Sequence, residues 1–202
     1  MRTHSYRFCL GLLIAVLLTS CSTVGTLQFT ERDIDSTANL VSNPSFNSYS
    51  SLPTDALKGW NVHLEPQGSA LSPVIIDPQE ATEGKTSLRI DASNRAVLIL
   101  SEPFQVRRYG GYYLRTYLKS SSTELPNLQL RFIVFKENGK ILNRFKSKIK
   151  PHSDWTLHSL SAGFIKPGAR FGRLAILIPP FKDGSVWLDN AGCFEVHGFK
   201  ID

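Results

Sequence analysis

The sequence predicts an all-β protein, a β-sandwich or jelly roll folded as a single domain. About ten short runs with alternating or β-branched and aromatic residues recur along the chain, and turn signals separate them. No window keeps helical spacing over three turns outside the first twenty residues. Many short strands at this spacing are typical of antiparallel sandwiches, because each hairpin returns the chain to the same sheet or the facing one.

The expected strands follow one another from residue 39 to the end of the chain. The candidate runs are 39–42, 60–64, 74–77, 87–91, 96–100, 112–119, 128–136, 140–149, 156–162, 173–179 and 185–197. Most of the turn signals between them pair glycine with a polar residue, glycine or proline. They are Asn43-Pro44, Gly84-Lys85, Gly110-Gly111, Asn138-Gly139, Pro167-Gly168 and Asp183-Gly184. Asn138-Gly139 between two alternating runs predicts a two-residue hairpin.

Alternation along a strand also predicts which side chains face the core. In 112–119 and 128–136 the expected core residues are Tyr112, Leu114, Thr116, Leu118, Leu128, Leu130, Phe132 and Val134. In 140–149 one face carries Ile141, Asn143, Phe145 and Ile149.

The N-terminus carries the strongest single motif. Arg2 and Arg7 precede an apolar stretch, 8–18, that ends at Leu18-Thr19-Ser20-Cys21. This resembles a bacterial lipoprotein signal peptide with its lipobox. The apolar stretch is about 11 residues, shorter than the ~20 that span a hydrocarbon core. A plain signal peptide cut elsewhere and an amphipathic anchor are the other interpretations.

The lipoprotein resemblance implies that residues 1–20 are removed and that Cys21 carries diacylglycerol and fatty acyl chains such as palmitate. Stable anchoring takes two or more chains, which lipoproteins as a class supply. Ser22 resembles an outer-membrane sorting signal, so we expect a lipid-anchored protein of the cell envelope, at the outer membrane. Residues 21–38 are polar and unpatterned and predict a lipidated tether. The domain is expected over residues 39–202.

Charge and cysteine content exclude several classes. The chain has 23 Lys and Arg against 17 Asp and Glu, far from the dense charge of a nucleic-acid binder. With Cys9 removed and Cys21 acylated, Cys193 has no partner for an intramolecular disulfide or a cysteine-based zinc site. Cys193 lies in an apolar run, so we expect a buried, inert thiol.

Six stretches in order resemble a carbohydrate-binding module of the galactose-binding-like jelly-roll superfamily, closest to modules of cellulases and xylanases. They are the opening strand and turn at 39–47, Gly59-Trp60, 83–90, 113–119, Asp154-Trp155-Thr156 and 186–190. The resemblance covers about 39–197 and implies a sandwich fold and a role in holding polysaccharide. It also implies that Trp60 and Trp155 are core residues, whereas the role of Trp187 stays open.

The same resemblance implies a structural calcium near Asp189 and the 43–47 turn, including Asn47. Calcium prefers carboxylates and backbone carbonyls among six to eight oxygen ligands. This chain has Asn47 where the family usually has Glu, and Asn190 where a second acid is common. The alternative is that Asp189 only caps a turn.

A ligand face is predicted from the side of the strands opposite to the core. If the strands adjoin, one sheet displays aromatic and basic residues, namely Tyr113, Arg115, Tyr117, Arg131, Arg144 and Arg173. Aromatic rings stack on sugar rings, and arginine pairs with carboxylate or phosphate in a fork geometry. The alternative is a solvated face, or one that contacts a protein.

Catalysis finds no support in the sequence. The chain has no HExxH, G-x-S-x-G or P-loop motif, and His63, His152, His158 and His197 show no metal-ligand spacing. We therefore predict a lipid-anchored, non-enzymatic module for an envelope or extracellular polysaccharide, which the basic face suggests is acidic. The alternative is a structural or assembly lipoprotein that docks an envelope protein through its sheet face.

Overall fold

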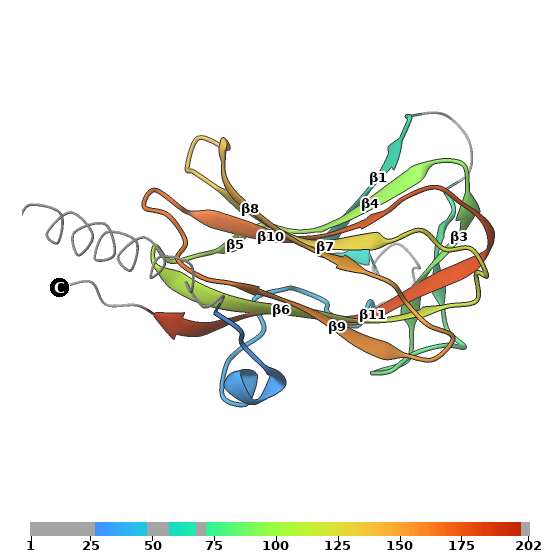
Figure 1. The fold of residues 1–202 in the computed structure, drawn as a ribbon, viewed down its shortest axis with the longest axis horizontal. Coiled ribbons are helices and arrows are strands. Elements are labelled where there is room, and N and C mark those ends of the chain that lie inside the picture. Colours follow the sequence, from blue (N-terminus) through green and yellow to red (C-terminus); the bar gives the residue numbers. More distant parts are fainter. Residues whose placement is uncertain (1–26, 48–56, 68–71, 199–202) are drawn as a thin grey trace, which may run out of the picture.

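Two antiparallel sheets face each other in a β-sandwich, as the sequence predicts (Figure 1). The computed structural model describes residues 27–47, 57–67 and 72–198. Sheet 1 has the strand order β1-β4-β10-β7-β8, with β5 also paired to β10, and sheet 2 has the order β2-β3-β11-β6-β9. The strands are β1 (Trp60–Glu65), β2 (Val74–Asp77), β3 (Ser87–Ser93), β4 (Ala96–Ser101), β5 (Phe104–Gln105), β6 (Gly110–Ser120), β7 (Leu128–Phe135), β8 (Ile141–Ile149), β9 (Thr156–Ala162), β10 (Phe171–Ile178) and β11 (Phe181–Gly198).

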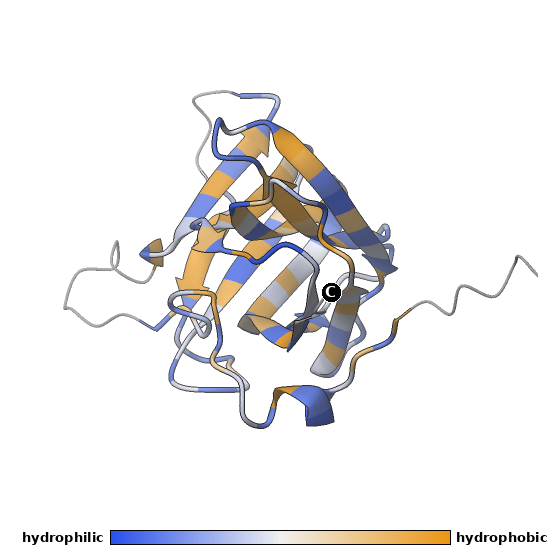
Figure 2. Cartoon of the chain, turned by 90° about the vertical axis from the view of Figure 1, so that its left-hand side faces the viewer, coloured by the Kyte–Doolittle hydropathy of each residue, from blue (hydrophilic) through white to orange (hydrophobic). Residues whose placement is uncertain are grey.

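The core lies between the two sheets, and alternation along the strands builds it. Figure 2 shows hydrophobic and hydrophilic residues following one another along single strands. The core positions predicted in β6 and β7 are confirmed, since all eight side chains are fully buried. The main hydrophobic cluster runs from Val41 to Cys193 along the chain. A chain that begins at residue 21 therefore keeps every residue of this cluster.

The N-terminal segment is packed on the outer face of sheet 2. The backbone N–H of Phe29 donates to Ser161 Oγ at 2.8 Å. The short 3-10 helix η1 (Glu31–Ile34) follows, and its Ile34 packs against Tyr113 and Phe194. The part of the predicted tether that the structure describes, residues 27–38, is therefore in contact with the domain and is not a free spacer.

Several details of the strand prediction are wrong. The expected turns Asp183-Gly184 and Gly110-Gly111 lie inside β11 and β6. Residues 39–42 form only a single bridge, Asn39 to Phe194, and the two-residue strand β5 was not foreseen. The β7–β8 turn has three residues between the paired Lys136 and Lys140, because Gly139 adopts a left-handed conformation with φ of 75°. A bulge then shifts the register, so Ile141 pairs with Phe135 and faces outward.

The predicted signal peptide (residues 1–20) and lipidated Cys21 lie outside the described residues. Within the described ranges, no helix combines the length and apolarity needed to cross a membrane.

Candidate functional site

The six residues predicted as one ligand face lie on opposite surfaces of the sandwich. Tyr113, Arg115 and Tyr117 belong to β6 in sheet 2, whereas Arg131, Arg144 and Arg173 belong to β7, β8 and β10 in sheet 1. The prediction that they share a face is wrong because the chain changes sheet after β6. That strand pairs with β9 and β11, and β7 pairs with β8 and β10.

Two of the three residues of the sheet 2 group, Tyr113 and Arg115, are already engaged within the domain. Arg115 forms an ion pair with Glu31, and its guanidinium lies 5.3 Å from the ring centroid of Phe194. Tyr113 is almost fully buried beneath the N-terminal segment, and burial raises its pKa to about 12. Arg115 and Tyr113 therefore hold the N-terminal segment in place and are not open to a ligand.

The sheet 1 group forms ordered rows across three neighbouring strands. Arg173 of β10 pairs with Ile133 of β7, which pairs with Arg144 of β8. The next row towards the β7–β8 turn places the side chains of Phe171, Phe135 and Ile141 side by side on the outer face. The row on the other side contains Ala175, Arg131 and Lys146. Apolar and cationic groups thus alternate on one continuous surface.

A hollow of about 340 Å³ lies at the aromatic row of this surface. Its lining residues are Pro103, Phe135, Gly139, Phe171 and Arg173. Phe171 is 37% exposed, so part of its ring is accessible from solvent. Gly172, between Phe171 and Arg173, faces the core. It lies against the rings of Phe132 and Phe104, which leave no room for a side chain at this position. Its neighbours Phe171 and Arg173 consequently point outward.

The cations on this surface have few internal partners. Within the described residues, no ion pair or hydrogen bond engages the side chains of Arg144, Lys146, Lys148 and Arg173. Arg131 alone is held, since its Nε and Nη2 donate to Gln129 Oε1 at 3.0 and 2.8 Å. The outward positions of β7, β8 and β10 carry no carboxylate. An anionic group on a ligand would therefore meet unpaired positive charge here.

Sequence reasoning missed the two phenylalanines of this hollow. Alternation with the core residue Val134 predicts that Phe135 faces outward, but Phe135 is not among the six predicted ligand residues. Phe171 precedes the expected strand start at residue 173. The signal that would have found it is the two-residue spacing from Phe171 to Arg173, which places both on one face of a strand.

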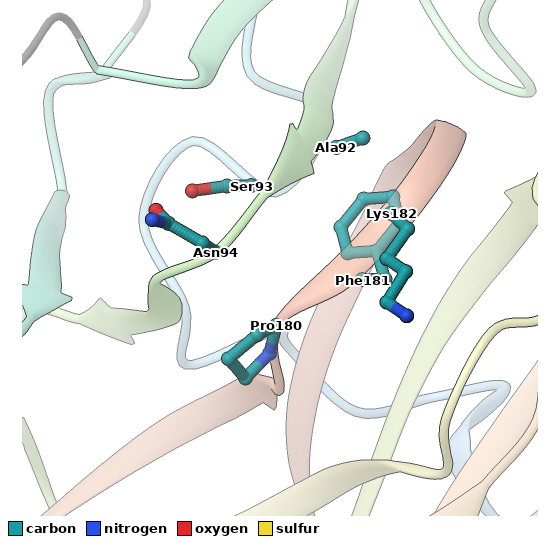
Figure 3. Close-up of a pocket in the computed structure, with 6 residues that line it drawn as sticks. All are labelled: Ala92, Ser93, Asn94, Pro180, Phe181 and Lys182. Atoms are coloured by element: carbon teal, nitrogen blue, oxygen red, sulfur yellow. The ribbon is translucent and has the colours of Figure 1, made fainter.

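A second hollow, of about 440 Å³, lies at the opposite end of the sandwich (Figure 3). Residues 92–94 form one side, and Pro180, Phe181 and Lys182 form the other. Phe181 is buried, so it presents little ring surface, and Lys182 is the only charged residue of the lining. This hollow lacks the combination of ring surface and clustered cations found on sheet 1.

The oxygens expected to bind calcium accept hydrogen bonds from the protein. Asp189 Oδ2 accepts from the backbone N–H groups of Thr82 and Glu83 at 2.6 and 2.9 Å, and from Thr82 Oγ1 at 2.8 Å. Asp189 Oδ1 accepts from the N–H of Asn190, and Asn47 Oδ1 from that of Lys85. These donors point at the oxygens that a cation needs, so the arrangement fits a loop-capping role better than a metal site. Calcium stays a prediction.

The remaining expected residues have structural surroundings. Trp60 is buried as predicted, and its Nε1 donates to the Asn43 carbonyl at 2.9 Å. Trp155 is only half-buried and lies outside the core cluster, in contrast to the expectation. Trp187 donates from Nε1 to Asp77 Oδ2, and Lys119 lies over its ring. Cys193 is buried as predicted, and this burial raises the pKa of its thiol.

Groups that would support metal chemistry are also missing from the described part of the chain. It contains no cluster of three or more His, Cys, Asp or Glu residues that would hold a metal ion. Of the histidines, His158 is half-buried, and desolvation lowers its pKa.

Solved structures with a similar β-sandwich fold include carbohydrate-binding modules. "Family 16 Carbohydrate Binding Module-2" superposes with a TM-score of 0.56 at 14% identity, over 78% of this chain and 100% of that chain. TmCBM61, solved in complex with β-1,4-galactotriose, gives a TM-score of 0.52 at 12% identity, over 78% and 99% of the two chains.

Part of an enzymatically active domain shares the fold as well. Tailspike protein 4 of bacteriophage CBA120 gives a TM-score of 0.61 at 13% identity, over 77% of this chain but only 21% of the tailspike chain. No family model and no curated protein matches the sequence. At these identities the likeness shows the β-sandwich fold and does not by itself assign a function.

Proposed function

We propose that this protein is a lipid-anchored, non-catalytic module that binds an acidic polysaccharide of the cell envelope or its surroundings through the outer face of sheet 1. The observation that carries the proposal is the hollow beside Phe135 and Phe171, with the cations of β8 and β10 next to it. The likeness of the fold to carbohydrate-binding modules supports the ligand class. The lipobox at Cys21 supports the anchor.

The chemistry of this face suits a charged sugar polymer. The C–H side of a pyranose ring is apolar and stacks on aromatic rings such as those of Phe135 and Phe171. The guanidinium groups of Arg144 and Arg173 form charge-assisted hydrogen bonds to a carboxylate or sulfate. Along β8, Lys146 and Lys148 follow Arg144 on the same side of the strand, with about 7 Å between successive side chains. A regular row of cations favours a polymer that repeats its negative charge.

Affinity electrophoresis tests the face with polygalacturonate as the acidic probe and β-1,4-galactan as the neutral one. We expect the chain from residue 21, carrying Cys21→Ser, to be retarded by polygalacturonate more strongly at 20 than at 200 mM NaCl, because salt screens exposed charges. Phe171→Ala and Arg173→Ala should each weaken binding by about tenfold, as for residues central to an interface.

Two matched controls separate this face from the rest of the surface. Ile75→Ala removes an apolar side chain with the same exposure as Phe171, and Arg32→Ala removes one exposed positive charge outside the sheets. Both should bind as the unsubstituted chain does. If Tyr117→Ala abolishes binding and Phe171→Ala does not, the ligand face lies on sheet 2 and the proposed site is wrong. Co-purifying envelope proteins without glycan binding would favour the assembly role instead.

The anchor has a separate test in the full chain. Expressed in a Gram-negative host, the protein should fractionate with membranes and gain the mass of diacylglycerol and acyl chains at Cys21. Cys21→Ser should leave the precursor uncut or release the protein, whereas Cys9→Ser should change nothing. Membrane fractionation and mass that are the same in Cys21→Ser as in the unsubstituted chain would refute lipidation.

A further inference from the structure

One end of the sandwich is distinctly basic. The loops 106–109, 136–140 and 163–170 meet there, because Tyr109 N donates to the Ile165 carbonyl and Arg170 N donates to the Phe135 carbonyl. We call these three loops the basal end. They carry six basic residues against one acidic residue, Glu137. The basic residues are Arg107, Arg108, Lys136, Lys140, Lys166 and Arg170.

The opposite end lacks this excess of positive charge. The described loop residues 66–67, 94–95, 121–127, 150–155 and 179–180 carry two basic residues against two acidic ones. The sandwich is therefore polarised along its strands, which run from one end to the other (Figure 1).

The basic residues of the basal end remain available to an outside partner. Arg107 is 79% exposed and reaches Glu195 only at 3.7 Å, and the Arg170–Glu137 pair spans 3.8 Å between two exposed side chains. Ion pairs between exposed side chains contribute little free energy, so these cations can readily exchange their partners for an outside ligand. The backbone beneath is fixed, because Arg107 N donates to the Tyr112 hydroxyl at 2.7 Å. The basal end thus presents exposed cations on a backbone held by hydrogen bonds.

The chain also enters the domain at this end. A Cβ on Gly163 would lie 2.7 Å from Leu27 Cδ1, so the Leu27 side chain contacts the 163–170 loop. Leu27 and the neighbouring Phe164 are both exposed large apolar side chains, and Lys166 follows two residues later. Leu27 is six residues from Cys21, a span of at most about 20 Å. Apolar and basic groups together at the lipid-proximal end match a bilayer surface, where apolar tips enter the interface and cations meet phosphate.

We infer that the basal end docks on anionic phospholipid headgroups of the membrane that carries the anchor. The inference rests on the proposed lipidation of Cys21, which sets the distance between this end and the bilayer. Docking at this end orients the strands away from the plane of the membrane. The outer face of sheet 1 is then roughly perpendicular to the membrane and accessible to a polysaccharide.

Vesicle flotation tests docking without the lipid. The chain from residue 21 with Cys21→Ser keeps every residue that the structure describes. We expect it to float with vesicles of phosphatidylcholine and phosphatidylglycerol at 50 mM NaCl, and to lose most of this binding at 500 mM NaCl or with phosphatidylcholine alone. The triple change Arg107→Glu, Arg108→Glu and Lys166→Glu should lower the bound fraction at least tenfold.

The matched control places the same charge changes elsewhere, in exposed Lys85, Lys150 and Lys182. It should float like the parent chain, and both triple variants should keep the parent's thermal midpoint. The docking inference is wrong if the parent chain floats equally with neutral and anionic vesicles. It is also wrong if the control variant loses as much binding as the basal triple variant. Polygalacturonate retardation should survive the basal change, since none of its residues lies on sheet 1's outer face. If docking fails while glycan binding and acylation are intact, only the docking inference is wrong and the proposed function stands. If the protein docks on anionic vesicles but does not bind glycan and is not acylated, only the proposed function is refuted.

Discussion

Phe132→Ala should lower the free energy of unfolding by about 3–5 kcal/mol, as large-to-small changes of buried phenylalanines do. Phe132 is fully buried in β7, and its ring lies 5.4 Å from that of Tyr112 and 6.1 Å from those of Phe104 and Phe145. These aromatic neighbours belong to several strands and cannot all move to fill the cavity that the substitution leaves. Urea denaturation followed by tryptophan fluorescence measures the loss.

Phe135→Ala is the matched control, three residues along the same strand but on the outer face. It should cost much less stability, because its side chain is only partly buried and lines the open hollow. It should instead weaken polygalacturonate binding, which Phe132→Ala leaves intact in the folded fraction. If both substitutions destabilise equally, the outer face of sheet 1 is covered in the native protein and is not a ligand face.

This separation of core from face is the part of the structure that the sequence predicts well. A strand side chain points in or out according to local alternation alone, so Leu128 and Phe132 were assigned to the core without knowledge of their partners. The turn residue Gly139 likewise acts locally, although its bulge added a residue and turned Ile141 outward. Errors of this kind shift single residues and leave the layers unchanged.

Sheet membership is a non-local property and was not predictable from pattern. β6 and β7 are consecutive, and both alternate, yet residues 121–127 carry the chain from one sheet to the other. That crossing divides the expected face into two groups of three. The contact between Arg115 and Glu31, 84 residues apart, is equally invisible to periodicity. The sequence therefore predicted three arginines of the sheet 1 face and none of the aromatic residues beside them.

Asp189→Ala should lower the free energy of unfolding by about 2–4 kcal/mol, because it leaves partly buried donors without an acceptor. The carboxylate is fully buried and fixes the backbone of Thr82 and Glu83 to β11 across more than a hundred residues of chain. Asp183→Ala is the control, since that carboxylate also accepts bonds from Ser122 and Thr123 but is only half-buried, near the start of β11. Its loss should be clearly smaller in the same urea titration.

Calcium and loop capping make different demands on Asp189. If the carboxylate only caps the 82–83 backbone, the thermal midpoint of the unsubstituted chain should be the same in 1 mM CaCl₂ and in EDTA. A resident ion would instead raise the midpoint by mass action, and Asp189→Asn would abolish the rise. Asp189→Asn also tests capping directly, because its amide must turn the N–H₂ group either towards the donors of Thr82 and Glu83 or towards the N–H of Asn190. Capping therefore predicts that Asn restores only part of the stability lost in Ala, with or without calcium.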